Sequence, residues 1–252
     1  MTETGYLISR GLTVIFLMIV FLVGVFSYQD STRRIDKLKF GFLTKYYQYY
    51  ISGLKMTLFI AFFAVICGII WGVCLALMKL SKHKLPHYFA TFYVNFIRGT
   101  PLLVQIYLIY FGLASLINLP DMVAAVVSLS MNSGAYVAEI VRAGIQAVDK
   151  GQTEAARSLG LTRFQTMRFI VLPQAIKNIL PALCNEFIIV TKDTSLVSVM
   201  GLHELMFNAD TIRGNTYLPF EPLLIAALIY FSISYVLTKG IGILERRLKK
   251  SD

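Results

Sequence analysis

The sequence contains little charge and few residues of the kinds that perform enzymatic chemistry. Only 15% of its 252 residues are charged, compared with about 25% in an average soluble domain. The three histidines, His83, His87 and His203, lie near the ends of apolar segments. They lack the paired carboxylates, serine partner or histidine cluster that a hydrolase within the membrane would need. We therefore expect no catalytic residue and no metal site.

Cysteine is scarce as well. The only cysteines are Cys67, Cys74 and Cys184, and all three fall within apolar runs without a CxxC pair. Cys67 and Cys74 are seven residues apart and therefore share one face of a helix. We expect small core residues in a packing seam, and the spacing argues against a disulfide or a metal site.

Long apolar runs dominate what is present. The chain is 56% hydrophobic, and each run approaches or exceeds the roughly 20 residues that span a bilayer as a helix. The runs show no period-two alternation, which argues against a membrane barrel. The sequence therefore predicts an all-α membrane protein. The six apolar segments cover approximately residues 11–28, 54–80, 92–117, 120–145, 174–206 and 219–244.

The net charge of +10 indicates topology before it indicates a partner. Lysine and arginine gather after the second and fourth segments and in the carboxy-terminal tail, which predicts that these parts are cytoplasmic. No motif for nucleic-acid binding accompanies the charge. The cations in these three parts are Lys79, Lys82, Lys84, Arg142, Lys150, Arg157, Arg163, Arg168, Lys177, Lys239, Arg246, Arg247, Lys249 and Lys250.

The first segment, 11–28, is less simple. It lacks a strongly charged start and a small-residue cleavage site, so we expect a retained anchor rather than a signal peptide. A sixth span would place the cations of linker 29–45 outside, against the positive-inside rule. Either the segment does not cross, or the downstream helices dictate its orientation.

The polar stretch 150–173 predicts a short helix over 152–159. Its residues are good helix formers, Glu154 is expected in the first turn, where it complements the helix dipole, and Gly160 supplies a stop signal. An interfacial linker that rests its apolar side chains on the bilayer is the alternative.

The fifth segment contains "TKDTS" at 191–195. Charged residues in a span usually face a bundle interior or a water-filled cavity. A helix broken here, with Thr194 or Ser195 capping a second half, would free backbone groups for a ligand. Lys192 and Asp193 could instead lie at the outer interface. Glu186 is expected near mid-membrane, and Glu139 and Arg142 can pair at i and i+3 near the inner end of their helix.

Several of these stretches together resemble one family. "EAARSLG" at 154–160 followed by "LPQA" at 172–175 is similar to the EAA loop of ABC importer membrane subunits. "FIRGTPLLVQIYLIYFGL", "SGAYVAEIVRAGI" and "TKDTSL" resemble the polar amino acid permeases in the same order and spacing. The resemblance implies a type-1 transmembrane domain over 46–252 with five core transmembrane helices and a coupling loop at 150–173. Residues 1–45, an apolar segment and charged linker, would add a further amino-terminal helix that spans, lies at the interface or docks.

The resemblance also implies partners. The chain would be a permease subunit of an ATP-driven importer of polar amino acids in the bacterial cytoplasmic membrane, together with ATP-binding subunits, a second permease chain, a solute-binding protein and membrane lipid. No G-x-x-x-x-G-K-[ST] motif is present, so ATP and Mg²⁺ would bind to the partner ATPase. The residues implied in coupling are Gln152, Glu154, Ala155, Ala156 and Gly160.

A substrate with an ammonium and a carboxylate needs both acceptors and donors. Glu186 could meet the ammonium, and Lys192 or backbone amides could meet the carboxylate. Both side chains could equally form purely structural pairs. The polar residues expected at substrate depth are Asn132, Ser133, Tyr136, Asn185, Glu186, Lys192, Asp193, Thr194 and Ser195.

A secondary transporter and an intramembrane enzyme are the alternatives. The absence of two repeated halves disfavours the first. The sequence leaves open which amino acid is carried and whether the permease pairs with itself or with a different chain.

Overall fold

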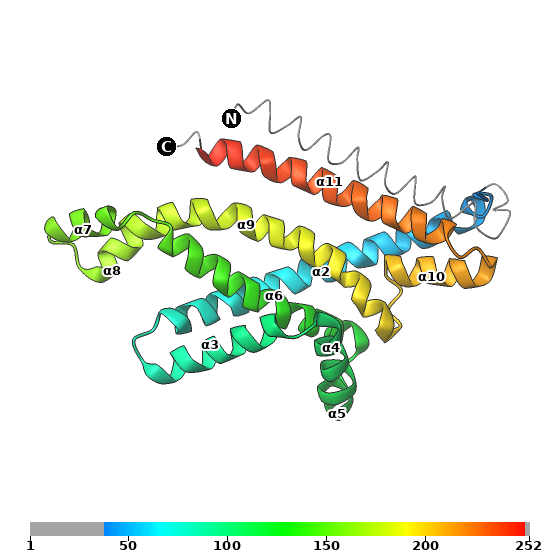
Figure 1. Ribbon diagram of the computed structural model, residues 1–252, viewed down its shortest axis with the longest axis horizontal. Helices are drawn as coiled ribbons and strands as arrows, with labels where there is room; N and C mark the ends of the chain where they lie inside the picture. Colours follow the sequence, from blue (N-terminus) through cyan, green and yellow to red (C-terminus); the bar gives the residue numbers. More distant parts are fainter. Residues whose placement is uncertain (1–37, 250–252) are drawn as a thin grey trace, which may run out of the picture. The chain divides into compact units, whose positions relative to one another are not determined.

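The part of the chain that the structure describes is helical. The computed structural model describes residues 38–249, so the expected amino-terminal helix at 11–28 lies outside the described residues. No strand occurs between residues 38 and 249, which confirms the all-α class for this part. The elements are α2 (Leu43–Leu80), α3 (Lys84–Gly99), α4 (Leu102–Tyr107), the π-helix η1 (Leu108–Ala114), α5 (Ser115–Ile117), α6 (Asp121–Gln146), α7 (Lys150–Ser158), α8 (Arg163–Thr166), the π-helix η2 (Met167–Val171), α9 (Leu172–Asp193), the 3₁₀-helix η3 (Thr194–Met200), α10 (Leu205–Thr216) and α11 (Glu221–Lys249) (Figure 1).

Several of these helices can cross a membrane. Among the described residues, α2, α6 and α11 are each long and apolar enough. A fourth crossing is available if α3 and Leu102–Ile117 form one span, although these two parts are bent by 110°. α9 has 22 residues but carries charged side chains such as Glu186 and Lys192. The predicted spans thus correspond to α2, α3 to α5, α6, α9 with η3, and α11, and their number stays a prediction.

The central pair, α2 and α6, packs closely through glycines (Figure 1). A Cβ atom added at Gly72 would lie 2.6 Å from the Val137 side chain, and one at Gly134 would lie 2.7 Å from the Trp71 ring. Small residues let helix backbones approach in this way. This crossing holds the middle of α6, including Ser133, against α2.

The prediction of small core residues is wrong for two cysteines. Cys67 and Cys74 are both exposed, and Cys184 is half-buried. The two share a helix face as expected, but α2 packs on α6 through the face that carries Gly68 and Gly72. At these glycines even a single Cβ atom would crowd α6. The α2–α6 contact is therefore made by glycines, and Cys67 and Cys74 lie outside it.

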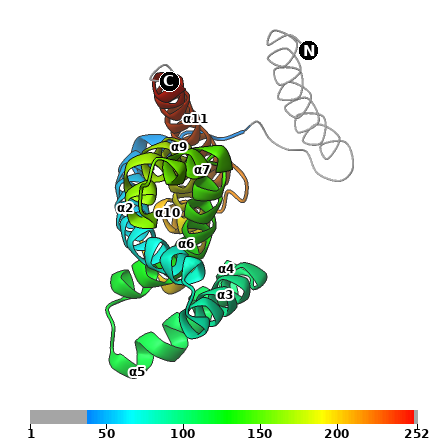
Figure 2. The same cartoon turned by 90° about the vertical axis from the view of Figure 1, so that its left-hand side faces the viewer.

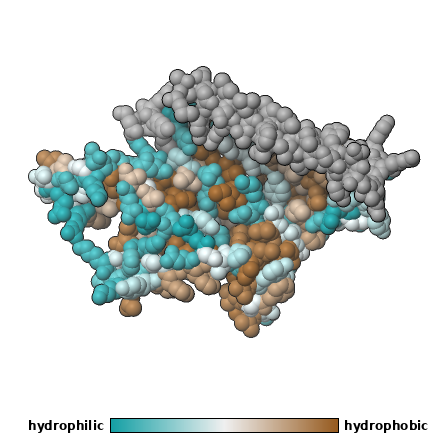
Figure 3. All heavy atoms as spheres, in the orientation of Figure 1, coloured by the Kyte–Doolittle hydropathy of each residue, from teal (hydrophilic) through white to brown (hydrophobic). Residues whose placement is uncertain are grey.

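The cationic connections gather at one end of Gly41–Asp252. The α2–α3 turn, α7 with α8, and the carboxy-terminal end of α11 lie at the same end, and α10 lies at the other (Figure 1). Figure 3 shows hydrophilic side chains around α7 and hydrophobic ones over α4 and α5. Figure 2 shows α3 to α5 projecting from the bundle that contains α2, α6 and α9.

A buried carboxylate joins α2, α10 and α11. Glu204 caps α10 by accepting hydrogen bonds from the backbone N–H groups of Met206 at 2.8 Å and Phe207 at 2.6 Å. The Tyr230 hydroxyl of α11 donates to it at 3.0 Å, and the Thr57 hydroxyl of α2 lies 3.5 Å away. The Glu204 side chain is fully buried, so these donors compensate for its lost hydration.

Candidate substrate and coupling sites

Two of the residues predicted to face substrate are buried side chains of α6 and α9, which pack against each other. Ser133 and Glu186 are 1% and 4% exposed. The Ser133 hydroxyl lies near the Glu186 carboxyl but outside ordinary hydrogen-bond geometry. Asp193, about two turns further along α9, lies within electrostatic reach of Glu186. Two carboxylates and a hydroxyl supply acceptors that suit a cationic group.

Asn132 is also buried, and it binds a residue that the sequence analysis missed. Its side-chain N–H donates to Oε1 of Gln105 in α4 at 3.0 Å. Gln105 in turn donates to the carbonyls of Ile97 and Thr100, at the end of α3. The sequence feature that could have identified Gln105 is its position as a lone polar residue inside an apolar segment, because such side chains usually face a partner within the bundle.

The other predicted substrate residues differ in burial. Thr194 is buried, whereas Asp193 and Ser195 are half-buried. Tyr136, Asn185 and Lys192 are exposed. The predicted set therefore comprises a buried group from α6, α9 and η3, an exposed group on α6 and α9, and the half-buried pair Asp193 and Ser195.

The predicted helix break at 191–195 is present as a change of helix type. The α-helix ends at Asp193, and the tighter η3 follows without a gap. The capping role predicted for Thr194 or Ser195 is wrong, because η3 has no side-chain cap. The Thr194 hydroxyl instead donates to the Thr191 carbonyl at 2.8 Å. The backbone stays helical there, so no new helix start needs a cap.

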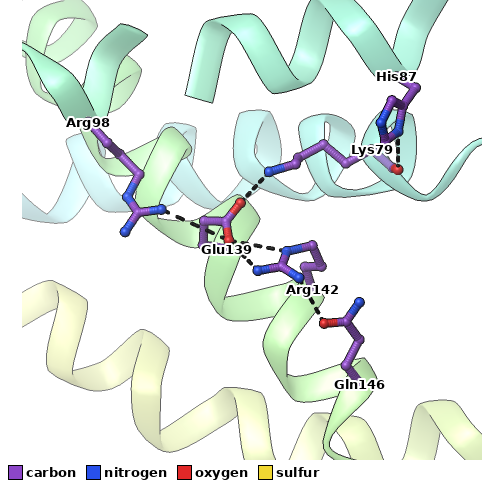
Figure 4. Close-up of polar contacts among 6 residues, drawn as sticks. All are labelled: Lys79, His87, Arg98, Glu139, Arg142 and Gln146. Atoms are coloured by element: carbon purple, nitrogen blue, oxygen red, sulfur yellow. Dashed lines mark hydrogen bonds and ion pairs between the residues drawn. The ribbon is translucent and has the colours of Figure 1, made fainter. Parts of the chain in front are cut away.

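The Glu139 carboxylate of α6 lies close to cationic side chains from three helices, α2, α3 and α6. Lys79 of α2 contacts Oε1, and Arg142 of α6 donates to Oε2 at 2.6 Å (Figure 4). Arg98 of α3 lies 3.9 Å from Oε2, and its guanidinium lies 5.4 Å from the centre of the Tyr136 ring. The predicted Glu139–Arg142 pair is confirmed. Glu139 therefore also connects α6 to α2 and α3.

The polar stretch after α6 folds into the short helix α7. The Asp149 side chain accepts the N–H of Gly151 at 2.6 Å and so caps the helix start. Gly160 adopts a φ of +85°, and the N–H of Leu161 donates to the Ala156 carbonyl at 3.1 Å. This pattern ends helices at a left-handed glycine, so the predicted stop at Gly160 is confirmed.

The residues implied in coupling differ in exposure. Gln152, Glu154, Ala155 and Gly160 are exposed, whereas Ala156 is 4% exposed. The helix begins at Lys150, earlier than predicted, so Glu154 lies beyond its first turn and its expected role there is wrong. The exposed side chains of α7 are free to meet a partner, and Ala156 packs against the rest of the chain.

The described part of the chain shows no group of histidine, cysteine or carboxylate side chains that could hold a metal ion.

Like Gln105, the partners of Glu204 were missed by sequence reasoning. Thr57 and Tyr230 come from helices far away in the sequence. Glu204 itself carried one usable signal, since an acidic residue directly before a helix is a common cap.

Residues 64–250 match the family model described as binding-protein-dependent transport system inner membrane component. The chain is 45% identical over 204 residues to the arginine transport system permease protein ArtQ of Bacillus subtilis, which covers 80% of this chain and 93% of that protein. It is 44% identical over 200 residues to the putative glutamine transport system permease protein GlnP of Rickettsia bellii, covering 79% and 92%.

Solved structures give the same picture. A chain in the crystal structure of an amino acid ABC transporter with histidines aligns with a TM-score of 0.81 and 51% identity, covering 84% of this chain and 100% of that chain. A chain of the MetNI methionine ABC transporter in an inward-facing conformation aligns with a TM-score of 0.64 over 84% of this chain and 99% of that chain. At 19% identity the second likeness concerns the fold alone.

Proposed function

Because the chain belongs to the family of binding-protein-dependent transport system inner membrane components, we propose that it is the permease subunit of an ATP-driven importer of polar amino acids. The chain is a multi-pass membrane protein and a transport permease rather than an enzyme. The match to amino-acid permeases over nearly their full length carries the proposal.

Permeases of this family work with ATP-binding subunits, a partner permease and a binding protein. In our proposal, ATP and Mg²⁺ bind to the ATP-binding subunits, which contact the cationic end of this chain from the cytoplasm. A solute-binding protein delivers the amino acid on the other side, and a second permease chain completes the path. The positive-inside rule supports this orientation of α7 and of the carboxy-terminal tail.

The proposed coupling contact uses the exposed face of α7, which carries Gln152, Glu154 and Ala155. Ala156 packs α7 against the rest of the chain. Gly160, in the left-handed conformation, ends the helix. α7 continues from α6 and leads through α8 and η2 into α9. Movement of α7 by the ATP-binding subunit would therefore shift both helices that carry the candidate substrate residues.

The proposed substrate site centres on Glu186, Ser133 and Asn132. The Glu186 carboxylate would accept hydrogen bonds from the substrate ammonium. The backbone amides of η3 belong to a helix that follows α9 without a gap, so Lys192 at the end of α9 is the proposed donor for the substrate carboxylate. Tyr136, Asn185, Asp193, Thr194 and Ser195 would line the route to and from this site.

Uptake by the full assembly tests the function. The chain would be co-expressed with the ATP-binding, permease and binding proteins encoded beside it, and the complex reconstituted into vesicles. We expect uptake of labelled arginine, glutamine or histidine with ATP and Mg²⁺, and none with a non-hydrolysable analogue. A panel of unlabelled amino acids then ranks the substrates by competition. Uptake that survives ATP depletion while an ion gradient is intact would indicate a secondary transporter instead.

Glu154→Lys tests the coupling contact. The reversed charge on exposed α7 should leave the membrane fold intact and uncouple ATP hydrolysis from uptake. Ser158→Ala on the same helix is the matched control, because it removes only an exposed hydroxyl bonded to the Glu154 carbonyl. Normal uptake by Glu154→Lys would remove the coupling assignment.

A further inference from the structure

The break between α3 and α4 leaves backbone groups that need partners. α3 ends at Gly99, and Thr100 and Pro101 are extended before α4 begins at Leu102. The two parts are bent by 110° at this point. The last carbonyls of a helix have no partner within the helix, and an unpaired carbonyl inside a membrane protein is costly.

One side chain closes this break. The Gln105 amide nitrogen donates to the Ile97 carbonyl at 2.7 Å and to the Thr100 carbonyl at 3.0 Å, and the Thr100 hydroxyl lies 2.9 Å away. Gln105 is only 5% exposed. Since an amide nitrogen has two hydrogens, these acceptors occupy it fully. The amide can take no other orientation without turning its oxygen toward carbonyls.

The fixed Gln105 amide in turn fixes Asn132. Its Oε1 faces α6 and accepts the Asn132 side-chain N–H at 3.0 Å. The Asn132 amide is thereby oriented with its nitrogen toward Gln105. The hydrogen bond of the Asn132 side chain with Gln105 uses its nitrogen and leaves its oxygen available as an acceptor. Asn132 is one of the buried polar side chains assigned above to the proposed substrate site.

We propose that Gln105 is a positioning residue for transport: it presents Oδ1 of Asn132 as an acceptor for the substrate and ties that acceptor to the α3–α4 break. The inference rests on the proposed function, because it assigns a role within the same substrate site. A movement of Asn132 on substrate binding would then be passed to the α3–α4 break through two successive hydrogen bonds, from Asn132 to Gln105 and from Gln105 to the carbonyls at the break. A shift of the bend likewise reorients the acceptor.

Transport kinetics test whether Gln105 positions Asn132 for the substrate. Gln105→Met keeps the side-chain length and removes the amide, and we expect KM for the transported amino acid to rise roughly tenfold, the value of one lost hydrogen bond. Asn132→Ala should raise KM similarly, and the double variant should be no worse than Asn132→Ala alone. Independent, multiplicative effects would overturn the proposal, since residues that act through one another are not additive.

Thr91→Val is the matched control. Thr91 lies on α3, and its hydroxyl is buried without a hydrogen-bond partner among the described residues. Its replacement alters a buried polar group of the same helix outside the Gln105 network. We expect KM to stay within about twofold of the wild type.

A distance measurement between α3 and α5 tests whether Gln105 holds the α3–α4 break, and it does not rely on transport. Spin labels would be placed at the exposed Phe89 of α3 and Leu116 of α5, in the full complex with the native cysteines replaced. Gln105→Met should broaden or shift the distance distribution, and Thr91→Val should not. An unchanged distribution in Gln105→Met would overturn the role of Gln105 at the break.

Two further outcomes are informative. If Gln105→Met does not assemble, Gln105→Glu replaces it: this variant loses the amide donors to the break, so the distances should broaden, and KM should rise as well because a shift of the bend reorients the acceptor. A rise in KM with unchanged distances contradicts the proposal. If the wild-type complex takes up no amino acid, the proposed function fails, and the distances still decide whether Gln105 holds the bend.

Discussion

Two buried glutamates, Glu186 and Glu204, have opposite surroundings. Glu204 accepts two backbone N–H groups and the Tyr230 hydroxyl, and these hold it at the start of α10. Glu186 has one favourable polar neighbour among the described residues, the Ser133 hydroxyl, and faces a second carboxylate at Asp193. The first is fully occupied by its own fold. The second has acceptor capacity to spare, as a site for a cationic group requires.

The difference has a thermodynamic meaning. A buried carboxylate is costly unless hydrogen bonds or a counter-charge replace its hydration. Glu204 obtains this compensation at folding, whereas Glu186 would obtain it on binding a substrate ammonium. Substitutions at the two sites should therefore separate stability from transport.

Glu204→Leu should have the largest effect. It leaves the N–H groups of Met206 and Phe207 and the Tyr230 hydroxyl without their acceptor, and each buried unpaired donor costs about 1–3 kcal/mol. We expect a loss of about 3–5 kcal/mol in the free energy of unfolding, measured as a lower thermal midpoint of the purified complex. Glu204→Gln, which keeps one acceptor oxygen, should lose less. A midpoint unchanged in both variants would contradict the structural role.

Glu186→Gln should act on transport instead. Loss of a charge-assisted hydrogen bond of about 1.5–3 kcal/mol predicts a KM for uptake that is about 10–100 times higher. The thermal midpoint should remain that of the wild type or rise, because the variant removes a buried charge next to Asp193. A fall in stability like that of Glu204→Leu would remove the contrast between the two glutamates.

Tyr230→Phe should give a moderate loss of stability. It removes one donor to Glu204 and should cost about 1 kcal/mol, with uptake per assembled complex unchanged. The matched control is Tyr235→Phe on the exposed side of the same helix, for which no change of the thermal midpoint is expected. Equal effects of the two substitutions would argue against the Glu204 network.

Ser133→Ala should be the mildest change. The Ser133 hydroxyl is buried without a hydrogen bond, so its removal should alter the free energy of unfolding by less than about 1 kcal/mol. KM should rise about two- to tenfold if the hydroxyl contacts the substrate. Ser128→Ala on the same helix removes a hydroxyl bonded to the Ala124 carbonyl and should leave KM unchanged.

The features that could be predicted from sequence are those that depend on neighbouring residues. The helical character, the short helix ending at Gly160 and the Glu139–Arg142 pair follow from local composition and spacing. The contacts of Gln105 with Asn132, and of Glu204 with Thr57, join helices that are distant in sequence. Periodicity cannot reveal such partners, because it fixes which face of a helix is buried but not which helix lies against it.

The 191–195 stretch shows a subtler limit. Its polar composition predicted a discontinuity, and the helix type does change after Asp193. The prediction failed in detail because a threonine hydroxyl can satisfy a carbonyl of the preceding turn as readily as it can start a new helix. Thr194 takes the first option.

The glycine crossing of α2 and α6 also restricts how this chain can move. With Gly72 seated on Val137 and Gly134 on Trp71, the two helices cannot slide along each other without steric overlap. We therefore expect the two helices to move as one unit. The Thr100 break between α3 and α4 and the π-helical turn η2 before α9 are then the places where the rest of the chain can bend relative to this pair.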